Sequence, residues 1–145
     1  MMLAGVVARY VDAWNAHDPR GCGECFAPGG ERVWLVFAPS HLDGDPFPRF
    51  SGRAAVASAI GDFIRAVPDL RVDVTALSEG SDDRVWTEWR LTGTHLEDWG
   101  DWLAAGEPVD LHGVSIFTVE ADGIALERVY WDMLTMVGES PVLAR

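Results

Sequence analysis

The sequence predicts an α+β fold in which helices lie on one side of a curved, mostly antiparallel sheet and enclose a pocket. Apolar residues recur at helical spacing at the start of the chain and once more after the first strand, whereas the second half alternates with the period of β-strands. Helices segregated to one side of an antiparallel sheet are typical of α+β domains. Neither a repeat nor a linker divides the 145 residues, so we expect one domain over residues 1–145.

Three helices are expected, two before the first strand and one after it. The first ends near Pro19, where proline and short polar residues interrupt the helical spacing. The short second helix runs to about Phe26, and the third ends at Pro68. The apolar positions of the first helix are Leu3, Val7, Tyr10 and Trp14, and those of the third are Val56, Ile60, Phe63 and Val67.

Five strands are expected, and the last four form an antiparallel meander. Residues 27–30 and 38–51 are rich in Pro and Gly, which predicts a turn before the first strand and a surface loop after it. A second long loop holds Trp99 and Trp102. The expected strands are residues 32–37, 70–74, 85–92, 109–119 and 124–131.

Strand alternation predicts which side chains share the concave face of the sheet, because successive residues point to opposite faces. It leaves Glu88, Arg90 and His112 on the outer face. A pocket that is mostly aromatic with few polar groups fits a bulky, flat, apolar ligand held by a few oriented hydrogen bonds. The residues expected to point inward from the last three strands are Val85, Thr87, Trp89, Leu91, Leu111, Gly113, Ser115, Phe117, Glu127, Val129 and Trp131.

Charge and hydropathy exclude several classes of partner. The formal net charge is −12, and all 11 basic residues are arginine. Such a surface repels phosphate backbones and anionic lipids, so we expect neither nucleic acid nor a membrane as a partner. The apolar stretches fall short of the ~20 residues that a membrane helix needs. The start at Met1 lacks the basic residues and cleavage site of a signal peptide, and we expect a cytoplasmic protein.

Two groups of residues have spacings that can bind metal. Cys22 and Cys25 stand in a Cys-x-x-Cys pattern, which can mark a redox pair or half of a zinc site. The segment before them predicts a helix rather than the strand that a redox pair follows, so we expect two small buried thiols. His41, Asp43 and Asp45 lie in a Pro/Gly-rich loop without further ligands. We therefore expect neither a bound metal nor a cofactor.

Seven stretches together resemble the SnoaL-like polyketide cyclases of the nuclear-transport-factor-2-like, or ketosteroid isomerase-like, superfamily. The resemblance implies a cone-shaped fold with three helices on a curved sheet around a central pocket. It also implies a homodimer formed through the outer face of the sheet. The superfamily includes isomerases, cyclases, dehydratases, epoxide hydrolases and binding proteins, so the fold alone does not assign an activity. The stretches are residues 6–18, 52–56, 68–70, 91–95, 113–117, 122–124 and 130–132.

Tyr10 is the first catalytic candidate. The stretch around it is similar to the opening helix of ketosteroid isomerases, where a tyrosine in this place donates a hydrogen bond to a developing enolate oxygen. A phenol suits this role because it keeps its proton near neutral pH and its ring tolerates an apolar wall. The alternative is a core tyrosine whose hydroxyl bonds to a carbonyl group.

Two carboxylates are further catalytic candidates. Glu127 is expected to face inward as a proton shuttle, the alternative being a glutamate paired with an arginine at the rim. Asp132 ends a stretch that resembles the family, and a one-residue bulge would turn it into the pocket. Without the bulge it caps the chain that follows. His95 and His112 are expected to face solvent.

The other functional positions of the superfamily carry different residues here. The second donor of the isomerases falls on Ser115, and their base falls near Trp34. The aspartate and histidine of the cyclases fall on Val129 and Ser115. The arginine and two aspartates of limonene-type epoxide hydrolases fall on Trp89, Leu91 and Val129. The chemistry of this chain, if any, therefore differs in its residues from all three.

We expect a cofactor-independent cyclase or isomerase that acts on a hydrophobic, polyketide-type natural-product intermediate. Catalysis would fold the substrate into a reactive shape and polarise one carbonyl or enol. The alternatives are a non-catalytic binding module for an apolar small molecule and, less favoured, an epoxide hydrolase. The residues expected to bind the substrate are Trp14, Trp34, Phe63, Thr87, Trp89, Ser115, Phe117 and Trp131.

Overall fold

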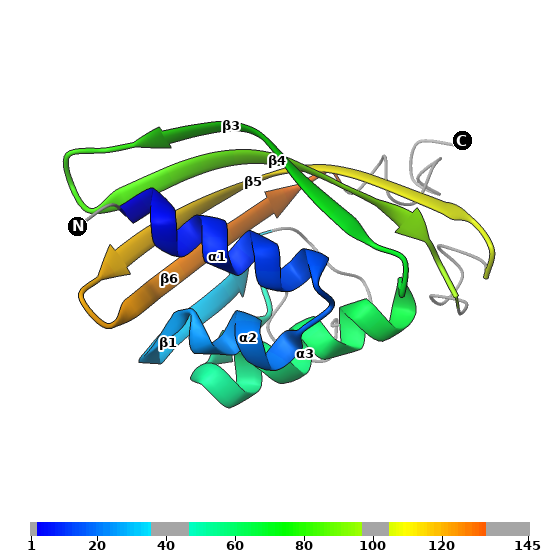
Figure 1. Ribbon diagram of the computed structural model, residues 1–145, viewed down its shortest axis with the longest axis horizontal. Helices are drawn as coiled ribbons and strands as arrows, with labels where there is room; N and C mark the ends of the chain where they lie inside the picture. Colours follow the sequence, from blue (N-terminus) through cyan, green and yellow to red (C-terminus); the bar gives the residue numbers. More distant parts are fainter. Residues whose placement is uncertain (1–2, 36–46, 97–104, 133–145) are drawn as a thin grey trace.

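In the part of the chain that the structure describes, three helices lie against one face of a curved six-stranded sheet (Figure 1). The computed structural model describes residues 3–35, 47–96 and 105–132. The predicted fold class is therefore confirmed: helices cover the concave side of a mostly antiparallel sheet.

The helices begin and end close to their predicted limits. Helix α1 (Leu3–Asn15) turns the apolar face that includes Tyr10 and Trp14 toward the sheet. Helix α2 (Pro19–Glu24) is capped by the Asp18 side chain, which accepts from the backbone N–H of Gly21, and it ends two residues before the predicted Phe26. Helix α3 (Arg53–Ala66) buries Val56 and Ile60.

The strands pair in the order β2-β1-β6-β5-β4-β3. Every neighbouring pair is antiparallel except β1 and β6, which are parallel. This places the first strand of the chain beside the last one. The strands are β1 (Phe26–Trp34), β2 (Arg49–Ser51), β3 (Arg71–Glu79), β4 (Arg84–Thr94), β5 (Pro108–Glu120) and β6 (Gly123–Trp131).

The first strand begins six residues earlier than predicted. Residues 27–30, predicted as a turn, lie inside β1, where the register with β6 shifts between Phe26 and Glu31. The Pro and Gly residues thus form an irregularity within a strand, not a connection between elements. Strand β2 lies in the region predicted as a loop, residues 38–51. Residues 38–46 of that loop, like the last two residues of the predicted strand 32–37, are outside the described part of the chain.

Burial along the strands confirms the predicted alternation. On β4, Val85, Thr87 and Leu91 are buried, while Glu88 and Arg90 are exposed. On β5 and β6, Ser115, Phe117 and Glu127 are buried, and His112 is exposed. The helices therefore cover the face that the alternation assigned to the pocket.

Candidate functional site

The concave face of the sheet and helices α1 and α3 enclose a pocket. Its cavity volume is about 50 Å³, within a space of about 630 Å³ that includes the open mouth. All the residues predicted to bind a substrate line this pocket: Trp14, Trp34, Phe63, Thr87, Trp89, Ser115, Phe117 and Trp131. Tyr10, Glu127 and Arg32 line it as well. The free interior is narrow, which suits a flat ligand.

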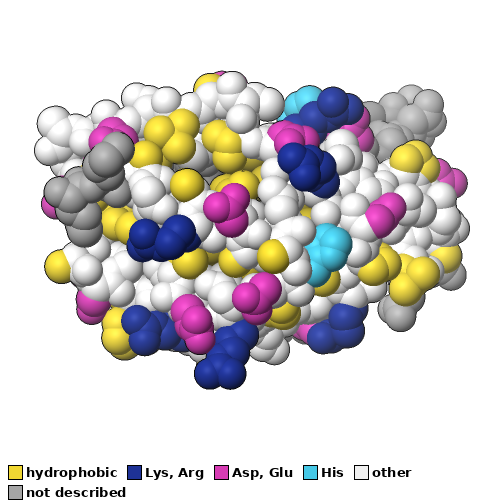
Figure 2. All heavy atoms as spheres, in the orientation of Figure 1, with side chains coloured by type: hydrophobic (Ala, Val, Ile, Leu, Met, Phe, Trp, Pro, Cys, Tyr) yellow, Lys and Arg dark blue, Asp and Glu magenta, His cyan; other side chains and the backbone are white. Residues whose placement is uncertain are grey.

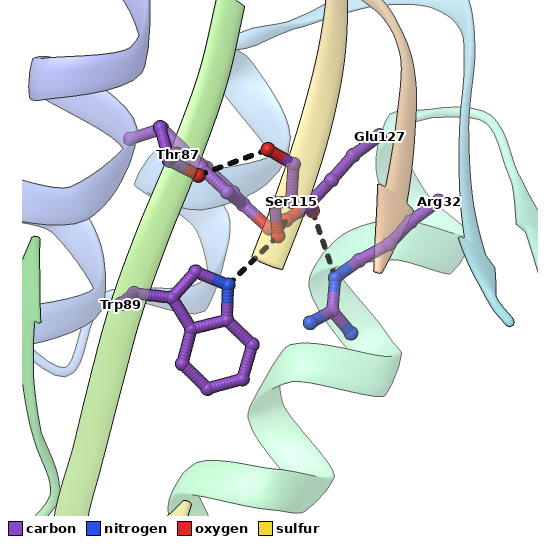
Figure 3. Close-up of polar contacts among 6 residues, drawn as sticks. Arg32, Thr87, Trp89, Ser115 and Glu127 are labelled. Atoms are coloured by element: carbon purple, nitrogen blue, oxygen red, sulfur yellow. Dashed lines mark hydrogen bonds and ion pairs between the residues drawn. The ribbon is translucent and has the colours of Figure 1, made fainter. Parts of the chain in front are cut away.

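Glu127 is the centre of a buried polar network (Figure 3). Its Oε1 accepts a hydrogen bond from the Tyr10 hydroxyl at 2.6 Å and another from Arg32 Nε at 2.9 Å. Its Oε2 accepts from the Ser115 hydroxyl at 2.9 Å. A carboxylate can be buried at low cost only when its oxygens are hydrogen-bonded and its charge is paired, and both conditions hold here.

Ser115 links Glu127 to the neighbouring strand. Its Oγ accepts from the Trp89 indole N–H at 3.0 Å, and its carbonyl oxygen accepts from the Thr87 hydroxyl at 3.0 Å (Figure 3). The indole reaches Ser115 because Gly113 stands opposite Trp89 in the ladder. A Cβ at Gly113 would lie 2.3 Å from a carbon of that ring. The missing side chain thus lets the indole lie flat across β5.

Arg32 is a functional candidate that the sequence analysis missed. It is 8% exposed, and it stands opposite Glu127 in the parallel β1–β6 ladder. Its guanidinium carbon lies 5.4 Å from the Trp14 ring centroid and 5.9 Å from that of Trp34. Aromatic faces attract a cation at these distances, so the two rings and Glu127 together stabilise the buried charge.

A signal for Arg32 was present in the sequence. It stands two residues before Trp34 in a segment read as a strand, so both side chains belong to the same face. Since Trp34 was assigned to the pocket, Arg32 belonged there as well. The partner of Glu127 is therefore a buried arginine on the neighbouring strand and not one at the rim.

Tyr10 lies in the pocket wall, but its proton is directed to Glu127. The ring is packed edge-on against Trp14, Phe26 and Phe117. Burial, and next the negative charge of Glu127, raise the pKa of the phenol well above its ordinary value. The hydroxyl thus stays protonated and positions the carboxylate. Direct donation to a ligand would require this hydrogen bond to break.

The remaining predicted candidates lie elsewhere. Asp132 is exposed and does not line the pocket, and its backbone N–H donates to the carbonyl oxygen of His112. His112 faces solvent as predicted. His95 is 2% exposed, so the prediction that it faces solvent is wrong. Its backbone pairs with Gly106 and Glu107, which extends the β4–β5 ladder and brings the histidine inward.

The two thiols of the Cys-x-x-Cys pattern are free and lie on and just after α2. Cys22 is buried, and burial raises the pKa of its thiol to about 12. Cys25 is half-buried, and its thiol donates to the carbonyl oxygen of Gly21. Among the described residues no group of three or more His, Cys, Asp or Glu side chains could hold a metal ion. His41, Asp43 and Asp45 lie outside the described residues.

The pocket and fold can be compared with known proteins. The family model of the SnoaL-like domain matches residues 7–127. The chain belongs to the SnoaL-like domain family. The match includes α1 from residue 7 onward and the first five residues of β6, and these parts supply Tyr10 and Glu127. No curated protein matches this SnoaL-like domain in sequence.

Solved structures share the fold of this SnoaL-like domain at low identity. A candidate SnoaL-like polyketide cyclase from Jannaschia sp. CCS1 is 20% identical with a TM-score of 0.73, over 96% of this chain and 93% of its own. SalBIII, an epoxide hydrolase/cyclase-like enzyme, is 22% identical with a TM-score of 0.71, over 93% and 94%.

A third structure is a protein with a ketosteroid isomerase-like fold from Catenulispora acidiphila DSM 44928. It is 19% identical with a TM-score of 0.70, over 93% of each chain. Such identities establish the shared fold and not a shared reaction.

None of the helices in the described ranges is long and apolar enough to cross a membrane. Figure 2 shows basic and acidic side chains interspersed over one face of the molecule, without a continuous basic patch on that face.

Proposed function

We propose that this chain is a cofactor-independent cyclase or isomerase that acts on a hydrophobic, polyketide-type intermediate. The observation that carries the proposal is the buried carboxylate of Glu127 in an otherwise mostly aromatic pocket. The names of two structural relatives agree with this class, since one is a candidate polyketide cyclase and SalBIII has a role in pyran ring formation in the polyether salinomycin.

The proposed reaction begins at a carbon next to a ketone of the substrate. Glu127 takes a proton from this carbon, and the electron pair of the C–H bond moves to the carbonyl oxygen as an enolate. Arg32 lies beside Glu127 and stabilises the growing charge on that oxygen. In an isomerisation Glu127 returns the proton to a different carbon. In a cyclisation the enolate carbon attacks a second carbonyl, which then takes the proton.

Tyr10 and Ser115 are positioning residues in this scheme. Each donates to a different oxygen of Glu127, so together they fix the rotation of the carboxylate. The aromatic walls exclude water and hold a long substrate folded, which brings its two reacting ends together. The uncatalysed reaction in water lacks this fixed arrangement of the reacting groups.

A non-catalytic binding module is the second candidate, and the same network supports it. Three donors already occupy the oxygens of Glu127 in the structure, an arrangement that also serves to stabilise a folded pocket wall. Epoxide hydrolysis is disfavoured. Among the described pocket residues Glu127 is the only carboxylate, while Trp89 and Leu91 occupy two of the three positions at which such hydrolases carry Arg or Asp.

The test is Glu127→Gln beside a matched control, Glu88→Gln, on the exposed side of β4. Each protein is incubated, without added cofactor or metal, with a panel of linear and fused-ring polyketones, and products are followed by liquid chromatography and mass spectrometry. General acid–base catalysis is typically worth about 10²–10⁴ in rate, so Glu127→Gln should lose turnover by that factor.

Thermal unfolding shows whether each variant is folded, and Glu88→Gln should match the wild type. Full turnover in a folded Glu127→Gln variant would reject the proposed role. Tight binding of panel members by the wild type without any turnover would instead favour the binding module.

A further inference from the structure

Most hydrogen-bond donors that line the pocket already bond within the protein, but some do not. The Tyr10, Thr87, Trp89 and Ser115 donors are all used within the protein. By contrast, the indole Nε1 of Trp131 is enclosed and has no hydrogen-bond partner among the described residues. Trp131 lines the pocket, and an indole N–H can only donate.

Arg32 adds further donors at the same polar end. Its Nε donates to Glu127, whereas its two terminal amino groups point away from that carboxylate (Figure 3). A guanidinium has five N–H donors and no acceptor. The Trp131 N–H is therefore the unpaired donor among these described residues, and the terminal N–H groups of Arg32 can supply further hydrogen bonds to a ligand.

The strongest acceptor of the pocket, the Glu127 carboxylate, is already in use. Both oxygens of Glu127 receive hydrogen bonds from the protein, and Tyr10, one of the donors, is only 2% exposed. A ligand N–H or O–H would therefore have to compete for Glu127 with donors of the protein itself. Burying such a donor without a partner is unfavourable, whereas a ligand carbonyl oxygen would accept from the Trp131 N–H, which is otherwise unpaired within the described residues.

The charges of the pocket cancel. Arg32 and Glu127 are 2.9 Å apart, and their side chains are 9% and 4% exposed. Among the described pocket residues they are the only ion pair. A charged ligand would leave one uncompensated charge between aromatic walls, which is strongly unfavourable.

We infer that the pocket selects an uncharged ligand that presents a hydrogen-bond acceptor, such as a ring ketone, to Trp131 and Arg32. The inference rests on the proposed function in that it places the substrate in the same pocket. It goes further by excluding substrates with a free carboxylate or ammonium group near the polar end.

The experiment uses four ligands with one two-ring skeleton: tetralin, α-tetralone, and the tetralins that carry a primary amine or a carboxylate at the same carbon. Isothermal titration calorimetry at neutral pH measures the dissociation constant of each. We expect α-tetralone to bind about tenfold tighter than tetralin, because it satisfies a buried donor. The ammonium and the carboxylate should each bind at least about tenfold more weakly than the ketone.

Trp131→Phe keeps an aromatic ring but removes the free N–H, so it should reduce the preference for α-tetralone over tetralin to less than about threefold. The matched control is Trp86→Phe, which changes an exposed indole on the outer face and should keep the full preference. Thermal unfolding monitors the folding of both variants.

Three results would overturn the inference: a charged ligand that binds as tightly as the ketone, a full ketone preference in Trp131→Phe, or no binding of any of the four. The outcome is separable from that of the turnover test. A ketone preference in a protein without turnover would support this inference and reject the proposed function. Turnover of charged polyketides would support the proposed function and reject this inference.

Discussion

The two faces of the sheet each carry a pair of arginine and carboxylate, in opposite surroundings. On the outer face Arg90 binds Asp110 through two hydrogen bonds of 2.8 and 2.7 Å, and both side chains are nearly half exposed. On the concave face Arg32 binds Glu127 through one hydrogen bond of 2.9 Å, and both side chains are almost fully buried. The exposed pair on the outer face therefore makes more hydrogen bonds than the buried pair on the concave face.

The difference shows that the surroundings determine what such a pair does. Water solvates the outer pair whether or not it forms, so its presence changes stability little. The inner pair has lost its water, so each charge depends on the other and on the hydroxyls of Tyr10 and Ser115. The inner pair is the one that can hold a reactive group in a fixed position.

The largest expected effect comes from removing one member of each pair. Glu127→Ala leaves the Arg32 charge buried and unpaired, so we expect a loss of about 3–5 kcal/mol in the free energy of unfolding. Asp110→Ala leaves Arg90 in water and should cause no measurable change. Urea unfolding at neutral pH measures both. Equal losses in the two variants would contradict the contrast between the two faces.

Tyr10→Phe is expected to have the next largest effect. It removes the phenol that donates to the Glu127 carboxylate while keeping the ring contacts. A hydrogen bond to a charged group contributes about 1.5–3 kcal/mol, so the free energy of unfolding should fall by that amount. Tyr130→Phe, on the exposed outer face, is the control and should unfold like the wild type. An unchanged stability in Tyr10→Phe would mean that the hydroxyl contributes nothing to the network.

Gly113→Ala tests how the concave face accommodates Trp89. The new methyl group would lie 2.3 Å from the indole and 2.6 Å from the Tyr130 carbonyl oxygen, so we expect a loss of about 1–3 kcal/mol and a displaced indole. Gly5→Ala in α1 meets nothing within 4 Å and should stabilise the protein, by up to about 1 kcal/mol. Chemical denaturation gives both values, and near-ultraviolet circular dichroism reports the indole. A Gly113→Ala protein with wild-type stability and spectrum would show that the sheet can shift enough to accommodate the methyl group.

Alkaline pH should lower the free energy of unfolding by a smaller amount. The pKa of Tyr10 is raised in the folded protein by burial and by Glu127, so the unfolded chain releases this proton first. Stability from this group is complete below about pH 10 and falls above it, by up to about 1.4 kcal/mol per pH unit. Tyr10→Phe lacks this dependence, so its deficit relative to the wild type should narrow from about pH 10 to 11. A constant deficit would argue against the raised pKa.

Residue alternation was enough to predict most of the pocket, because a strand buried on one face repeats with period two. It placed Thr87, Trp89, Ser115 and Glu127 correctly on the concave face. It did not predict how they pair, since hydrogen bonds such as that from Tyr10 to Glu127 join residues on elements far apart in sequence. The proposed bulge at Asp132 failed to bring that residue to the pocket, because β6 pairs regularly with β5 from Leu126 to Trp131.

The first strand shows a second limit of prediction from local sequence. Pro28 and Gly29 are typical turn residues, and local propensity alone favoured a turn. Pairing with β6 overrides that preference and makes room for both residues in an irregular stretch of β1. The pairing partner, β6, lies at the other end of the described chain, so a local sequence pattern cannot predict the pairing.

The parallel pairing of β1 with β6 also decides when the pocket can be completed. Arg32 and Glu127 are 95 positions apart, and the intervening chain must be ordered or looped before they meet. Contacts between distant residues form slowly, because closing the loop costs entropy before the contact repays it. On a ribosome, which makes chain from the N-terminus, Arg32 emerges long before its partner is synthesised. The charged end of the cavity is thus among the last parts to assemble, and a nascent chain without β6 has an arginine but no carboxylate to receive it.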